Sequence, residues 1–150
     1  MVNKTMSLYL DTSVVGGYFD EEFEQDTKLL FEKVKAGEYK AFVSTIVIGE
    51  LARAPEEIRN LLNEIEHSVI KVLPEYERLA DEYIKEKVVG ETSRDDCIHI
   101  ATATVNNIDV LVSWNFKHIV NVKRIISYNS VNMKNGYKCL EIRSPKDLGG

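Results

Sequence analysis

No apolar run in the 150-residue chain is long enough to cross a lipid bilayer, and the segment Met1–Thr5 is not a signal peptide. We therefore expect a cytoplasmic protein that does not enter membranes. Cysteine is also scarce: Cys97 and Cys139 have no metal-ligand spacing, and we interpret both as buried thiols. No cluster of histidine and cysteine suits a zinc ion, which excludes zinc chemistry.

Motifs for two further classes of enzyme are missing. The segment Val15–Tyr18 contains two glycines but has neither the lysine of a phosphate-binding P-loop nor the spacing of a dinucleotide site. No Gly-x-Ser-x-Gly turn is present to carry a hydrolase nucleophile. Positive charge is in deficit as well, with a formal net charge of −5. The chain is therefore no general coat for nucleic acid, and any binding of nucleic acid must be local.

What is present is the composition of an ordinary globular protein, with 44% hydrophobic and 29% charged residues. The length suits one domain over residues 1–150, and no repeat, linker or low-complexity segment divides it. Short β-rich runs predict strands at 8–11, 40–44, 69–73, 110–113 and 138–142. Longer amphipathic runs predict helices at 14–19, 26–35, 45–54, 55–65, 76–87, 93–106 and 122–134. Strands separated by helices need crossover connections, so we expect a mostly parallel sheet.

Three acidic residues stand out because each lies at the end of an apolar segment or inside one. Asp11 closes the first predicted strand, Glu50 lies in the helix after the second, and Asp96 begins the helix before the fourth. Asn115 comes just after the fourth strand. Ligands of parallel sheets bind at the carboxyl ends of the strands, so these residues could converge on one edge. Carboxylates brought together repel, and a divalent cation would relieve that repulsion.

Each acid also has a purely structural explanation. Asp11 is a residue type that caps helices, and Asp96 could be the last residue of a capping box. Arg53 lies three residues after Glu50 and could form an ion pair with it. Spacing alone does not choose between Asp95 and Asp96.

Three further side chains have open roles. His99 lies one turn after the acidic pair, where it could orient a carboxylate or contact substrate. His118 follows the fourth predicted strand and could take part in catalysis, and Trp114 could stack on a base. For all three we favour the structural reading, in which the side chain packs in the protein or lies at its surface.

Four segments, in order along the chain, resemble the PIN-domain family, which includes the VapC-like toxins of toxin–antitoxin pairs. Leu8–Ser13 resembles the family's strand ending in aspartate, and Ser44–Leu51 resembles its Ser/Thr-x5-Glu-Leu helix. Asp95–Ala103 resembles its Asp-x-x-Ile-x-Ala-x-Ala helix, and Val110–His118 resembles its Leu-Val-Thr-x-Asp/Asn block. This register selects Asp96 over Asp95. The tail after Val120 matches only loosely.

The resemblance implies a three-layer α/β/α sandwich with a mostly parallel central sheet. It also implies a ribonuclease that depends on Mg²⁺ or Mn²⁺ and hydrolyses RNA phosphodiester bonds. Asp11, Glu50 and Asp96 carry over as metal ligands, and Ser13 and Thr45 as residues that support them. The implied partners are RNA, a small antitoxin protein and a second copy of the chain in a homodimer.

The chain departs from the family at Asn115, which completes the catalytic set where many relatives have a fourth aspartate. Asparagine contributes no charge, although it can coordinate through its carbonyl oxygen or hold a water molecule. The alternative hypothesis is therefore a PIN-like module that binds RNA or protein for regulation, with weak catalysis or none. Cations expected near the site, where they could hold phosphates, are Arg53, Arg94, Lys117 and Lys123.

Overall fold

A computed structural model describes residues 4–149 of the chain. Its centre is a five-stranded sheet with the order β3-β2-β1-β4-β5, in which every neighbouring pair is parallel. The strands are β1 (Met6–Leu10), β2 (Tyr39–Ser44), β3 (His67–Ile70), β4 (Val110–Val112) and β5 (Glu141–Arg143). The predicted parallel sheet is confirmed.

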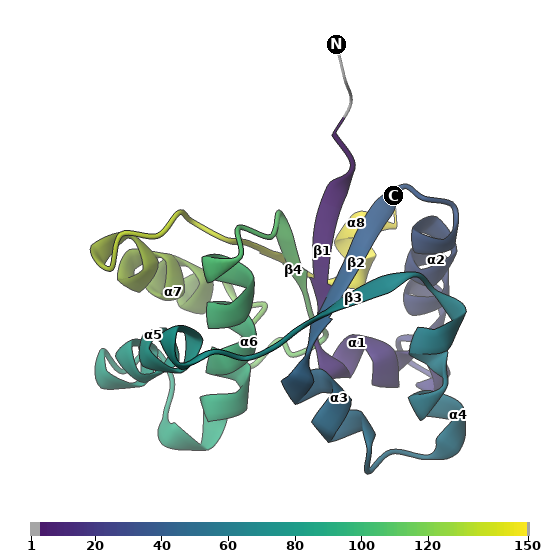
Figure 1. Ribbon diagram of the computed structural model, residues 1–150, viewed down its shortest axis with the longest axis horizontal. Helices are drawn as coiled ribbons and strands as arrows, with labels where there is room; N and C mark the ends of the chain where they lie inside the picture. The colour runs from purple at the N-terminus through teal and green to yellow at the C-terminus, as the bar shows by residue number, and fades with distance from the viewer. Residues whose placement is uncertain (1–3, 150) are drawn as a thin grey trace.

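Helices cover both faces of this sheet (Figure 1). The α-helices are α1 (Thr12–Gly16), α2 (Glu24–Lys35), α3 (Thr45–Leu51), α4 (Glu56–Arg59), α5 (Pro74–Lys85), α6 (Arg94–Val105), α7 (Val122–Lys134) and α8 (Pro145–Leu148). The 3₁₀ turns are η1 (Gly17–Phe19), η2 (Leu61–Glu64) and η3 (Glu91–Ser93). Helices α5, α6 and α7 form one layer and α2 and α8 belong to the other, which confirms the α/β/α sandwich. Within residues 4–149, no helix has the length and apolarity needed to cross a membrane.

Burial is greatest in the central strand β1 and in helix α6. Leu8, Tyr9 and Leu10 of β1 are all fully buried, as expected for a strand covered by helices on both faces. Every residue of α6 from Cys97 to Thr104 is also buried, so this helix is enclosed on all sides. Polar side chains on α6 therefore lie inside the protein, where each needs a hydrogen-bonding partner.

Three predicted elements differ from the structure. The helix expected over 55–65 consists of two short turns, α4 and η2, because α4 buries none of its residues and packing does not extend it. The strand expected over 69–73 is β3, which begins earlier because its register follows β2, from Ala41↔His67 onwards. The strand expected over 138–142 is β5, which is short because β4 offers only three residues for pairing.

Two expectations about single residues were also wrong. Cys97 is buried, but Cys139 is exposed, because it lies in the connection between α7 and β5. The capping box considered for Asp96 would begin at Ser93, but the side chain of Ser93 makes no capping hydrogen bond, since its backbone (φ −101°, ψ 22°) lacks the extended conformation of a capping residue. A capping box occurs instead at α8, between Ser144 and Asp147.

The sheet topology decides where a ligand can enter. From β1 the chain runs through α1 and α2 to β2, whereas it reaches β4 through α5 and α6 on the other face. The neighbours β1 and β4 are therefore the point at which the strand order reverses. In open parallel sheets, the carboxyl ends at this point border the crevice that binds ligands. Asp11 follows β1 and Ser113 follows β4, so both lie at this crevice.

Candidate active site

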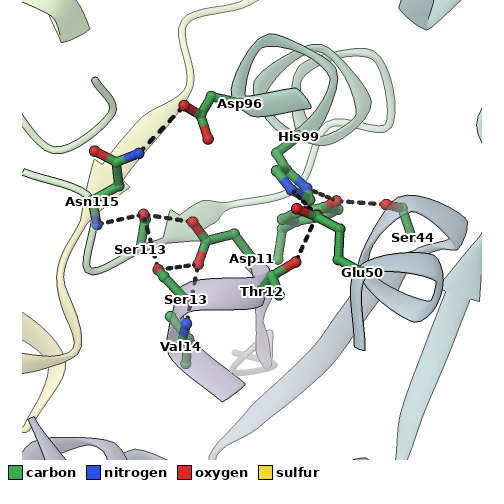
Figure 2. A network of polar contacts seen from close by, with 11 residues as sticks. Asp11, Thr12, Ser13, Val14, Ser44, Glu50, Asp96, His99, Ser113 and Asn115 are labelled. Carbon is green, nitrogen blue, oxygen red and sulfur yellow. Dashed lines mark hydrogen bonds and ion pairs between the residues drawn. The ribbon is translucent and has the colours of Figure 1, made fainter. Parts of the chain in front are cut away.

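Asp11 lies at the centre of the polar network shown in Figure 2. It caps α1, as expected, because its Oδ1 accepts the N–H of Val14 at 3.2 Å. The same oxygen accepts the hydroxyl of Ser13 at 2.6 Å, and Oδ2 accepts that of Ser113 at 2.6 Å. Burial raises the pKa of Asp11, although the charge of His99 and these three hydrogen bonds act in the opposite direction. The protein's own groups therefore compensate this carboxylate incompletely.

Glu50 reaches the network from α3. Its Oε1 accepts the hydroxyl of Thr12 at 2.7 Å and a hydrogen bond from Nε2 of His99 at 3.0 Å (Figure 2). Within residues 4–149, no hydrogen bond reaches Oε2. The bond from His99 is the main reason that the pKa of Glu50 is lowered. Within residues 4–149, the ion pair considered between Glu50 and Arg53 is not formed, and the partner of Glu50 is His99.

His99 is a further candidate residue of the site, although its sequence context favoured a structural role. It is 3% exposed, and its Nδ1 lies 2.7 Å from the hydroxyl of Tyr9, which itself lies 2.7 Å from Oγ of Ser44. A carboxylate only accepts hydrogen bonds, so Nε2 must carry the hydrogen that faces Glu50. Burial alone would lower the pKa of His99, but the bond to Glu50 and the surrounding carboxylates raise it.

A signal for His99 was present in the sequence. The residues around it on the helix are apolar or small, and a lone histidine in such a helix needs a buried partner. That partner could not be identified, because Glu50 lies 49 residues away and Tyr9 lies 90 residues away along the chain.

Asp96 lies in the first turn of α6, next to Asp95, which is exposed. Burial raises the pKa of Asp96, and repulsion from Asp11 and Glu50 adds to this effect, while His99 and His118 oppose it. Its Oδ2 accepts a hydrogen bond of 3.3 Å from Nδ2 of Asn115. Asp96 therefore resembles Asp11 in lacking full compensation of its charge.

Asn115 makes two hydrogen bonds that fix the orientation of its amide. Its Oδ1 accepts the backbone N–H of His118 at 2.9 Å, and its Nδ2 faces Asp96. A backbone N–H can only donate, so the carbonyl oxygen must be the atom turned toward His118. Asn115 thus presents a donor to Asp96, whereas the sequence analysis considered its carbonyl oxygen as a metal ligand.

Two residues with open roles have structural contacts. The indole N–H of Trp114 donates to Oγ1 of Thr27 at 2.9 Å, and its ring stacks on Phe23 with 4.2 Å between centroids. The carbonyl of His118 accepts the hydroxyl of Tyr128 at 2.9 Å, while its buried Nδ1 has no partner within residues 4–149. The packing role favoured for Trp114 is confirmed, and His118 anchors the loop after β4.

Ser13 and Thr45, the two residues expected to support the metal ligands, differ in whether they hydrogen-bond to a carboxylate. Ser13 donates to Asp11, as described above. The hydroxyl of Thr45 instead accepts the N–H of Val72 at 3.2 Å, and within residues 4–149 it makes no hydrogen bond to a carboxylate. Thr12 instead supports Glu50, since it begins α1 directly beside Asp11.

The crevice thus brings together Asp11, Glu50, Asp96 and Asn115, with Asp96 above Asp11 and Glu50 to the right of both in the view of Figure 2. Within residues 4–149, no three His, Cys, Asp or Glu side chains are arranged as a group that could hold a metal ion. The donor chemistry still fits Mg²⁺, which binds through one or two carboxylates and retains several waters. A cation beside Asp11 and Asp96 would offset the charge that the protein leaves uncompensated.

Comparisons with known proteins agree with this architecture. Residues 8–118 match the family model described as PIN domain, whereas no curated protein sequence matches the chain. VapBC2 from Rickettsia felis, bound to a DNA fragment from its promoter, has a TM-score of 0.61 at 18% identity, covering 93% of this chain and 98% of that chain. VapC20 from Mycobacterium tuberculosis, a Sarcin-Ricin loop cleaving toxin, has a TM-score of 0.58 at 16% identity, covering 74% and 92%.

A toxin–antitoxin complex from Klebsiella pneumoniae is also similar, with a TM-score of 0.54 at 17% identity, covering 74% of this chain and 88% of that chain. At such identities the likeness shows a shared fold, which is that of VapC toxins. The family match shows more than a shared fold, because it spans most of the chain and includes all four residues of the crevice. The chain therefore belongs to the PIN domain family.

Proposed function

We propose that the protein is a metal-dependent endoribonuclease that hydrolyses RNA phosphodiester bonds, and that it is the toxin of a toxin–antitoxin pair. The observation that carries this proposal is the pair of incompletely compensated carboxylates, Asp11 and Asp96, at the strand-order reversal of a PIN fold. Similar folds occur in a toxin that cleaves the Sarcin-Ricin loop and in a toxin–antitoxin complex. These likenesses support RNA as substrate and a small antitoxin as partner, while the homodimer stays a prediction.

Asp11 and Asp96 would hold Mg²⁺ or Mn²⁺, together with the unengaged Oε2 of Glu50. When bound, the ion supplies charge stabilisation for phosphoryl oxygens and lowers the pKa of water. Around it, the side chains of the protein set the geometry. Ser13 and Ser113 engage both oxygens of Asp11, which prevents the carboxylate from rotating.

The other two acids are held in the same manner. His99 and Thr12 engage Oε1 of Glu50, which directs Oε2 away from them. The amide of Asn115 engages one oxygen of Asp96 and leaves the other available. Partners that fix a metal-ligating carboxylate are worth about 10–100-fold in metal affinity or activity.

A second candidate function is a PIN-like module that binds RNA or protein with weak catalysis or none. Asn115 favours it, because an amide replaces a charge beside Asp96 and its oxygen is engaged by His118. The lack of a three-residue metal group within residues 4–149 points the same way. The two candidates differ in turnover, which can be measured.

The test is RNA cleavage by purified protein with Mn²⁺, with Mg²⁺ or with excess chelator. We expect cleavage only with metal, and a loss on the order of 10²–10³-fold in Asp96→Asn, since a bound ion supplies several kcal/mol. Asp95→Asn is the matched control, because it removes the same charge from the exposed neighbour and should retain activity. Equal cleavage by both variants, or cleavage in chelator, would refute the nuclease. RNA binding without turnover would establish the module.

A further inference from the structure

Charge is distributed very unevenly along this acidic chain. The segment from Val110 to Leu140 contains no aspartate or glutamate. Its five cationic side chains are Lys117, Lys123, Arg124, Lys134 and Lys138. Since the whole chain has a net charge of −5, the remaining residues have −10. The positive segment also includes the loop after β4 and Asn115, and thus adjoins the candidate active site.

Arg124 ties together the segments that carry Lys117 and Lys87. Its Nε donates to the carbonyl of Lys117 at 3.1 Å, and its Nη1 donates to the carbonyl of Val88. The loop after β4, the first turn of α7 and the turn after α5 therefore lie side by side. They border a hollow of about 350 Å³ that Lys87, Lys123 and Arg124 help to line.

The lysines around this hollow are available for a ligand. Lys87, Lys117 and Lys123 are exposed and form no ion pair within residues 4–149. Glu86, which also lines the hollow, is held by Lys134 at 2.5 Å. Arg94, by contrast, forms an ion pair with Asp81.

Phe116 adds an exposed aromatic ring between Asn115 and Lys117. It is 48% exposed, and its ring centroid lies 6.0 Å from that of Trp114 and 6.4 Å from that of Phe23. Those two rings stack on each other, so Phe116 rests on a rigid base. Trp114 is only 7% exposed and offers no face to a base, whereas Phe116 does.

We propose that Phe116, Lys117, Lys123 and Lys87 form a basic surface that binds single-stranded RNA beside the candidate active site. The lysines would contact successive phosphates, and Phe116 would stack on one base. This inference rests on the proposed function, whose site it extends. RNA is favoured over an acidic protein segment, because an aromatic ring and separated lysines continue directly from the residue that holds Asp96.

The test measures binding of a short fluorescein-labelled single-stranded RNA without divalent metal, over a series of salt concentrations. All variants also carry Asp11→Asn, which prevents cleavage from a residual metal ion. Lys117→Gln with Lys123→Gln should lower the slope of log K against log salt by roughly 1.4, since each phosphate contact on a single strand contributes about 0.7. Lys40→Gln, an exposed lysine of β2, should leave it unchanged.

Phe116→Ala should weaken binding by at least about fivefold without changing the salt slope, and Phe116→Tyr should restore it. Unchanged affinity and slope in the lysine variants would overturn the proposal. Competition by poly-glutamate as strong as by unlabelled RNA would also overturn it and assign the surface to an acidic protein. Binding is read without cleavage, so failure of the nuclease proposal would leave this result interpretable.

Discussion

Glu50 and Asp11 lie in the same crevice, yet their surroundings affect them in opposite directions. Glu50 is paired with His99, and its pKa is lowered. Asp11 is more deeply buried and accepts hydrogen bonds from two hydroxyl groups and one N–H, and its pKa is raised. The carboxylate of Asp11 accepts three hydrogen bonds and that of Glu50 accepts two, so the number of bonds does not explain the difference. Burial does, because it outweighs the opposing groups at Asp11, whereas at Glu50 the hydrogen bond from His99 outweighs burial.

The other residues of the crevice fall into two groups according to which of these two carboxylates they accompany. We call Tyr9, His99 and Glu50 the histidine half, in which a ring N–H of His99 holds the carboxylate. Asp11, Asp96 and Asn115 form the aspartate half, in which Asn115 supplies a donor without charge. A cation from solution would thus stabilise the aspartate half more than the histidine half.

The largest effect should come from Asp11→Asn in the aspartate half. Cleavage should fall on the order of 10³-fold, because the variant removes a ligand worth several kcal/mol. The metal-free fold should become more stable. The folded-state pKa of Asp11 is raised, so the folded protein binds the extra proton as pH falls, and stability decreases as pH rises from the unfolded pKa through the folded one. The amide of the Asp11→Asn variant does not ionise, so at neutral pH the variant avoids that loss of stability.

Thermal unfolding of metal-free protein at acidic and neutral pH measures this effect. If about 1 kcal/mol is recovered at neutral pH, the midpoint should rise by roughly 2–4 °C. Added Mn²⁺ should raise the midpoint of the unsubstituted protein and have little effect on the variant. A variant that is less stable than the parent at neutral pH would contradict the division into two halves.

An intermediate effect is expected from His99 in the histidine half. His99→Leu removes the N–H that holds Glu50 and should lower kcat about 10–100-fold, with little change in KM for RNA. His99→Gln keeps an amide N–H and should recover part of the activity. The measurement is steady-state cleavage together with Mn²⁺ affinity by calorimetry. Equal losses in the leucine and glutamine variants would show that His99 only fills space.

The smallest effect is expected from Asn115→Asp. It places a like charge where a donor bonded Asp96 at 3.3 Å, although an oxygen remains for the N–H of His118. Loss of about 1 kcal/mol would lower the metal-free unfolding midpoint by roughly 2–4 °C. Mn²⁺ should restore the midpoint, because it offsets the added charge. An unchanged midpoint without metal would mean that the amide of Asn115 contributes nothing to holding Asp96.

Much of the fold could be predicted because its signals are local. Apolar runs of strand length that alternate with amphipathic runs predict a parallel sheet between helices. Asp11 and Asn115 could be placed at one edge because Asp11 directly follows a strand and Asn115 lies in the loop just after another. The boundaries of β3 and β5 could not be predicted, since pairing with β2 and β4 sets them.

The sequence by itself determined the layered fold and the place of Asp11 at the end of its first strand, because the periodicity of side chains is a property of neighbouring residues. Only the tertiary structure decided how those acids differ. Ser113 reaches Asp11 across 102 residues, and His99 reaches Glu50 across 49. Burial and hydrogen-bond partners depend on such distant contacts, so the incompletely compensated aspartates and the histidine-bonded glutamate become distinguishable only once the chain is folded.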